Sequence, residues 1–236
     1  MTRNLLLISN STLHGSGYLD HCESEIRDIL GKRKSVLFIP YAQPGGMTWK
    51  AYTSLARQRL EKMGYTLHGI HTANDLWSAI DHAEALFIGG GNTFMLLYSL
   101  FRDNLISTIK GAVADGLPYI GTSAGANVAG RTIKTTNDMP VVLPPSLDAL
   151  GLIPFIINPH YLDTDPQSKH MGETRETRIK EYQSFNNDTV VGLREGAMLR
   201  VIDDHVSLRG SSGARIFRKG QDPTEHQPGE SLDFLL

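Results

Sequence analysis

Short runs of apolar residues recur along the first half of the chain, separated by longer segments of mixed polarity. The runs cover residues 5–8, 35–39, 65–70, 85–88 and 117–120. Continuous apolar runs of this length are typical of strands that are buried on both faces. The intervening segments are predicted to form helices over 19–30, 48–63, 92–101 and 105–114, the first two ended by glycine. Strands alternating with helices predict an α/β fold, with a mostly parallel sheet flanked by helices.

The pattern changes after residue 131. A proline-containing loop over 139–146 is followed by an apolar stretch at 153–158 and a charged helix expected over 172–185. The last third is predicted to form short additional strands over 189–193, 198–202, 205–208 and 214–217, joined by tight turns such as Asp203-Asp204. No segment has the composition of a linker, so we expect a single domain spanning residues 1–236.

Charge and cysteine content restrict the class of protein. The 23 basic and 25 acidic residues are mixed along the chain and give a net charge of -2, so neither nucleic acid nor an anionic membrane is an expected partner. No apolar stretch approaches the roughly 18 residues of a membrane span. Cys22 is the only cysteine, which excludes an internal disulfide. We expect a cytoplasmic protein, monomeric or homodimeric, that needs no metal or organic cofactor.

The candidate nucleophile is Ser123, in the motif Gly121-Thr122-Ser123-Ala124-Gly125. The motif lies between a predicted strand and a segment that begins a helix, which is the context of a Gly-x-Ser-x-Gly nucleophile turn. Small flanking residues leave room for the neighbouring chain and for a substrate. The alternative is that Ser123 only caps the helix through a backbone hydrogen bond.

A second glycine cluster, Gly89-Gly90-Gly91-Asn92-Thr93, follows the predicted strand at 85–88. The amides of Gly90 and Gly91, together with that of Ala124, are candidate donors of an oxyanion hole. A tight turn or a phosphate cradle are the alternatives. A dinucleotide site is not expected, because Phe94 stands where the third glycine of that fingerprint should be.

A serine nucleophile needs a general base and an acid that orients it. His160 is the first candidate base, because it ends the apolar stretch before it and therefore lies at the end of a strand; His170 is the second. Glu195 occupies a similar strand-to-turn position and is the first candidate acid. The residue pattern alone leaves three alternatives for the acid, namely Asp163, Asp165 and Glu173.

Five segments in one order resemble the peptidase E family of α-aspartyl dipeptidases: 121–128, 89–93, 158–161, 172–175 and 193–196. The resemblance implies a flavodoxin-like fold of the class I glutamine amidotransferase kind. It also implies hydrolysis of Asp-Xaa dipeptides through an acyl-enzyme, with Ser123 as nucleophile, His160 as base and Glu195 as acid. A serine stands where a glutamine amidotransferase has cysteine, which argues against ammonia transfer from glutamine.

An aspartyl side chain needs a fixed cation to select it. Arg175 and Arg178 stand three apart on the predicted helix and so share a face; Arg175 is preferred because it lies in the family-like segment. The alternative is an exposed helix with ion pairs. His170 and Asn92 are further pocket candidates, and the loop over 135–145 is a candidate for excluding longer peptides.

Two other functions remain open at this stage. A cyanophycinase-like peptidase would cut β-aspartyl linkages. A non-catalytic protein could use the glycine loop and Ser123 to hold a small anion.

Overall fold

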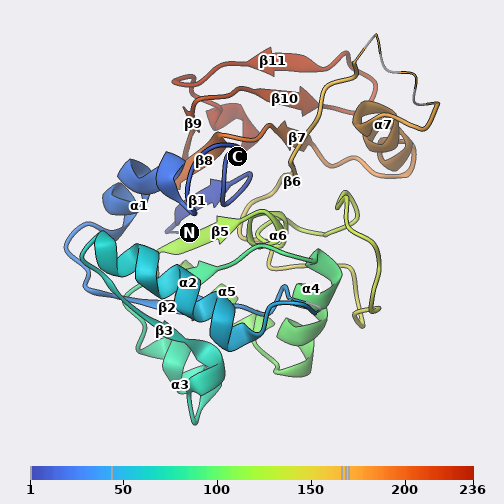
Figure 1. Cartoon of the computed structure of the whole chain (residues 1–236). Helices are drawn as coiled ribbons and strands as arrows, with labels where there is room; N and C mark the ends of the chain where they lie inside the picture. Colours follow the sequence, from blue (N-terminus) through green and yellow to red (C-terminus); the bar gives the residue numbers. More distant parts are fainter. Residues whose placement is uncertain (1, 44, 166, 168, 170) are drawn as a thin grey trace.

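The computed structural model describes residues 2–236 except 44, 166, 168 and 170, and consists of two sheets with helices around the larger one (Figure 1). The larger sheet has seven strands in the order β3-β2-β4-β5-β1-β8-β9. Their bounds are Asn4–Ile8 for β1, Ser35–Ile39 for β2, Thr66–Gly69 for β3, Leu86–Ile88 for β4, Tyr119–Thr122 for β5, Ala197–Ile202 for β8 and His205–Gly210 for β9. The first five strands in the chain are mutually parallel, and β8 and β9 extend the sheet in antiparallel fashion beside β1.

The two faces of the larger sheet are covered by different helices. Helices α1 (Glu23–Leu30) and α2 (Trp49–Lys62) pack on the face that contains Leu6 and Ile8. Leu5 and Leu7 point to the other face. That face is covered by α3 (Leu76–Asp81), α4 (Thr93–Arg102), α5 (Ile106–Ala114) and the short α6 (Ala124–Asn127). Because consecutive side chains of a strand point to opposite faces, the apolar runs supply both cores.

The smaller sheet has four strands in the order β11-β10-β7-β6. Their bounds are Ile156–Pro159 for β6, Val190–Leu193 for β7, Ala214–Phe217 for β10 and Thr224–His226 for β11. Strands β6 and β7 are parallel, whereas β10 is antiparallel to both of its neighbours. Helix α7 (Arg175–Phe185) lies at this end of the molecule, away from α2 and α3 (Figure 1).

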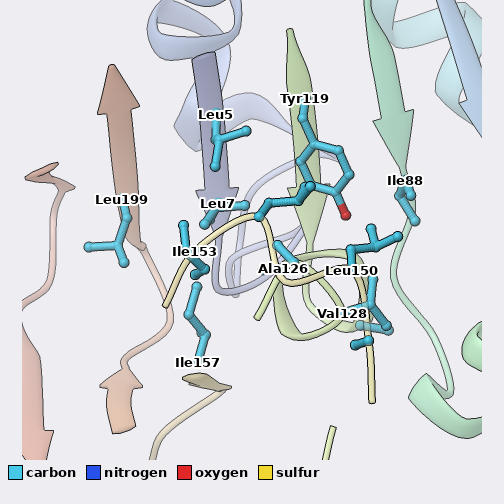
Figure 2. Packing of buried hydrophobic residues seen from close by; sticks show 14 of the residues in the cluster. Leu5, Leu7, Ile88, Tyr119, Ala126, Val128, Leu150, Ile153, Ile157 and Leu199 are labelled. Carbon is cyan, nitrogen blue, oxygen red and sulfur yellow. The ribbon is translucent and has the colours of Figure 1, made fainter. Parts of the chain in front are cut away.

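A continuous apolar core joins the two sheets. Leu5 and Leu7 of β1 and Tyr119 of β5 lie on the same side as Ile153, which precedes β6, and Ile157 of β6 (Figure 2). All five side chains are at most 1% exposed. The smaller sheet is therefore held against β1 and β5 of the larger one by tight apolar packing.

The predicted α/β class and the mostly parallel sheet are confirmed, with differences at the ends of helices. The charged helix begins at Arg175 instead of residue 172, because Thr174 caps it by accepting a hydrogen bond from the Thr177 amide. The first helix begins at Glu23, after a short 3-10 turn at Asp20–Cys22. Helix α3 and strand β11, with six and three residues, were not predicted. In the described part of the chain, no helix has the length and apolarity needed to cross a membrane.

Candidate active site

The turn between β5 and α6 brings two glycines into close contact. A Cβ at Gly121 would overlap the backbone of Gly125 and Ala126, and a Cβ at Gly125 would overlap the carbonyl of Ile88. Between them, Ser123 has a φ of 52° and a ψ of -110°, a strained conformation for a residue with a side chain. Its side chain does not cap α6. The strand-to-helix turn thus leaves the Ser123 hydroxyl free for another partner.

That partner is His160, which follows β6. The Ser123 hydroxyl lies 2.9 Å from His160 Nε2, and His160 Nδ1 lies 2.7 Å from Glu195 Oε1. In the tautomer that fits both contacts, Nδ1–H donates to the carboxylate and Nε2 accepts from the hydroxyl. The three side chains that the sequence singled out therefore form one hydrogen-bonded line, with the geometry of a serine hydrolase triad.

The alternative acids have other partners. Both oxygens of Asp163 accept hydrogen bonds of 2.7 Å from Arg194, which holds the pKa of that carboxyl below its usual value. Glu173 pairs with Arg178 at 3.6 Å, and Asp165 accepts from the Gln167 amide. Glu195 is the acid that contacts His160.

The second glycine cluster lies against Ser123, but its amides differ in whether they already donate a hydrogen bond within the protein. A Cβ at Gly90 would lie 3.0 Å from Ser123 Cβ. The Gly90 N–H donates to the buried Tyr52 hydroxyl at 2.9 Å, so the expectation that it serves an oxyanion is wrong. In the described part of the chain, the amides of Gly91 and Ala124 donate to no other protein group. Gly91 has a φ of 138°, which a residue with a side chain rarely adopts.

The two candidate arginines line a cavity of about 590 Å³ beside the triad. Leu162, two residues after His160, lines it too, as does Asn137, whose side chain donates to the Pro159 carbonyl. Burial and the neighbouring Arg178 lower the pKa of the Arg175 guanidinium. A partly buried guanidinium whose own pKa is depressed favours an anionic partner.

The remaining pocket candidates behave differently. Asn92 caps α4 through its Oδ1, which accepts from the Met95 amide, and its Nδ2 donates to the Met139 carbonyl. It therefore holds the loop after residue 135 against α4. His170 lies outside the described residues.

Sequence reasoning did not single out Asp138, which lies close to these groups. Its Oδ2 accepts from both the amide and the hydroxyl of Thr93, at 2.7 and 2.6 Å. The same carboxylate acts on Arg175 in the direction that raises the arginine's pKa. The only sequence signal was its position in the loop over 135–145, because its partners lie far away along the chain.

Comparisons with known proteins agree with this geometry. The model of peptidase family S51 matches residues 5–209. The chain belongs to this family. Its relatives include a peptidase E of Streptomyces coelicolor, 48% identical over 99% of this chain and 95% of the relative. A probable alpha-aspartyl dipeptidase of Drosophila melanogaster is 46% identical over 99% of this chain and 98% of that protein.

Solved structures share the fold of this S51 chain. A putative peptidase E of Listeria monocytogenes has a TM-score of 0.68 at 24% identity, covering 90% of this chain and all of that one. A peptidase of an acI-B1 Actinobacterium has a TM-score of 0.74 at 20% identity, covering 98% and 97%. The family expected from the sequence motifs is confirmed.

Proposed function

We propose that this chain is a serine dipeptidase that hydrolyses Asp-Xaa dipeptides at the bond after the N-terminal aspartyl residue. The observation that carries the proposal is the hydrogen-bonded line from Ser123 through His160 to Glu195, with distances of 2.9 and 2.7 Å. Membership of family S51 and the names of the two curated relatives support the substrate class.

The first half of the reaction forms an aspartyl ester. His160 Nε2 takes the proton of the Ser123 hydroxyl while Oγ forms a bond to the aspartyl carbonyl carbon. Glu195 holds the imidazole in the required tautomer and stabilises the imidazolium. The negative oxygen of the tetrahedral intermediate accepts hydrogen bonds from the Gly91 and Ala124 amides, each such donor being worth about 3 to 4 kcal/mol.

The second half releases the products. The C–N bond breaks as His160 gives its proton to the leaving amine, which departs as the free second amino acid. A water molecule then attacks the ester, His160 takes its proton, and the Ser123 oxygen leaves as the hydroxyl with that proton. Aspartate is released, and the enzyme returns to its starting state.

Substrate selection is assigned to the cavity beside the triad. The Arg175 guanidinium binds the aspartyl side-chain carboxylate, because a planar guanidinium can give two charge-assisted hydrogen bonds to a carboxylate. Arg178 has less capacity for substrate, since it is paired with Glu173. An uncharged first residue would leave the Arg175 charge partly buried without a partner.

A dipeptide panel tests the proposal. Asp-Leu should be hydrolysed, and Glu-Leu, Ala-Leu and N-acetyl-Asp-Leu should be poor substrates, with amino acid release followed by chromatography. Ser123→Ala should abolish release from Asp-Leu. A β-aspartyl dipeptide in the same panel identifies the alternative linkage: if it were cleaved faster than the α-linked one, the proposed substrate class would be wrong.

A further inference from the structure

The triad is assembled from both sheets. Ser123 follows β5 of the larger sheet, whereas His160 follows β6 and Glu195 follows β7 of the smaller one. The distance between nucleophile and base therefore depends on how the two sheets are held at this end. The apolar core of Figure 2 packs the two sheets against each other. Apolar packing is not directional, however, and does not set the length of a hydrogen bond to a fraction of an ångström.

The side chains of the triad do not by themselves fix the distance between nucleophile and base. The His160 side chain is 39% exposed and that of Glu195 is 53% exposed. A pair so open to water contributes little to holding the two groups in place, because solvent competes for both of them. The orientation of the base and the acid must come from the backbone that carries them.

Three successive residues at the carboxyl end of β1 contact that backbone. The Ile8 carbonyl accepts a hydrogen bond of 2.9 Å from the Ser123 amide. The Ser9 hydroxyl accepts one of 2.9 Å from the His160 amide, and the Asn10 Oδ1 accepts one of 2.8 Å from the Gly196 amide, adjacent to Glu195. A single short segment thus accepts one hydrogen bond from the backbone at or next to each of the three triad residues.

Ser9 also links the ends of two strands of the smaller sheet, β6 and β7, through its hydroxyl. While it accepts from His160, its hydroxyl donates to the Leu193 carbonyl at 2.8 Å, at the end of the strand that leads to Glu195. The Ser9 amide donates to the Ala197 carbonyl at 3.1 Å. Both Ser9 and Asn10 are buried, with 0% and 1% exposure, so these hydrogen bonds do not compete with water.

The backbone conformation of His160 makes the contact from Ser9 more important. Its φ of 52° is unusual for a residue other than glycine and strains the backbone. Such a conformation persists only where the surroundings hold it. The amide of His160 donates to the Ser9 hydroxyl, and without that acceptor this partly buried amide would lose its partner.

We infer that Ser9 and Asn10 are positioning residues of the triad, which act through the backbone of His160 and of Gly196 to place the base and the acid against Ser123. The inference rests on the proposed function for its kinetic consequence. Neither side chain touches the reacting atoms. Their effect is on how often the line from Ser123 to Glu195 is complete, and therefore on kcat more than on KM.

The first test compares two buried serines. Ser9→Ala should lower kcat for Asp-Leu by about 10- to 100-fold with KM changed less than about twofold, since a displacement near 1 Å can cost about 100-fold. The matched control is Ser99→Ala in α4, which is equally buried and whose hydroxyl has no partner among the described residues. Equal kcat values for the two variants would overturn the inference.

A double-mutant cycle separates positioning from general destabilisation. Residual hydrolysis is measured for His160→Ala with and without Ser9→Ala. If Ser9 acts through His160, its removal should change the rate less than about twofold once the imidazole is gone. An undiminished effect in the His160→Ala background would show a merely structural role. Asn10→Ala provides a second variant of the same kind, should Ser9→Ala fail to fold.

An NMR measurement tests the positioning role of Ser9 and Asn10 separately from the proposed function. The proton between His160 Nδ1 and Glu195 gives a far-downfield proton resonance in NMR spectra when the hydrogen bond is held. It should be seen in the wild type and in Ser99→Ala, and be shifted or lost in Ser9→Ala and Asn10→Ala. Failure of the wild type to cleave Asp-Leu would refute the function alone, whereas an unchanged resonance in both variants would refute the positioning role.

Discussion

The triad and the arginine-lined cavity lie next to each other but are built in different ways. Each triad residue follows a strand. The segment at the end of β1 accepts hydrogen bonds from the amides of Ser123, of His160 and of Gly196, which adjoins Glu195. Arg175, in contrast, is the first residue of α7, a helix with only Ile179 and Gln183 buried. The groups proposed for catalysis are therefore placed by the two sheets, and the group proposed for substrate selection lies at the end of a helix with a small buried surface.

Because of this contrast, substitutions in the triad and substitutions at Arg175 should have different effects. A change in the triad removes a group from a framework that stays folded, and affects every substrate alike. A change at Arg175 alters one wall of a cavity whose other lining residues, apart from Arg178, lie outside the helices and strands, and it should affect substrates according to their charge. Four expected outcomes test the contrast, from the largest to the smallest.

The largest effect is expected for Ser123→Ala, which should lower kcat for Asp-Leu by about 10⁶-fold while the protein remains folded. The hydroxyl makes its hydrogen bond with His160, outside the hydrophobic core, so its loss should leave the melting temperature within about 2 °C. A turnover assay measures kcat, and thermal unfolding followed by circular dichroism measures the melting temperature. Retained turnover of Asp-Leu would refute the mechanism.

Arg175→Ala should lower kcat/KM for Asp-Leu by about 10- to 100-fold, because a charge-assisted pair with the substrate carboxylate is lost. Hydrolysis of Ala-Leu should change little. Arg178→Ala is the comparison variant, and its effect should be smaller because Glu173 already engages that side chain. Equal losses for Asp-Leu and Ala-Leu in Arg175→Ala would remove the selectivity role.

Tyr52→Phe probes the glycine loop. Its hydroxyl accepts the Gly90 hydrogen bond, and burial raises the pKa of Tyr52, so the hydroxyl stays neutral. Its loss should leave the Gly90 amide unpaired and lower kcat by about 10-fold, as the adjacent Gly91 amide is less well held. Tyr182→Phe, which removes a hydroxyl bound to Asp188, should leave kcat unchanged. A reduced kcat in both variants would indicate a non-specific effect.

The smallest effect concerns stability. Ser123→Gly should be more stable than Ser123→Ala by about 1 kcal/mol, or about 2 to 4 °C in Tm, because glycine adopts a positive φ without strain. Both variants should be inactive, so the comparison isolates the cost of the nucleophile turn. If Ser123→Gly melted at or below Ser123→Ala, the turn would not be strained.

Much of the site follows from the local sequence. The Gly-x-Ser-x-Gly motif lies where a strand ends and a helix begins, and it supplies the glycines that this turn needs. Ser123 could therefore be predicted from this short segment. The apolar runs predicted the strands of the parallel sheet, since a strand buried on both faces must be apolar throughout. His160 was found because it ends such a run.

Other features depend on contacts between distant segments, which the local pattern does not contain. The choice of Glu195 over Asp163 was decided by Arg194, which binds Asp163 and leaves Glu195 to His160. The role expected for Gly90 was wrong because Tyr52, 38 residues earlier, takes its amide. Short elements such as α3 and β11 were missed because few residues define them.

The sequence by itself determined the fold class, the turn that carries the candidate nucleophile and the strand ends at which the other candidate groups stand, because periodicity and turn chemistry act over a few residues. Only the tertiary structure decided that His160 and Glu195 come from a second sheet, and that Ile8, Ser9 and Asn10 accept hydrogen bonds from the amides of Ser123, His160 and Gly196. Hydrogen bonds between residues 151 and 186 positions apart leave no trace in local spacing, since they form only when the chain has folded.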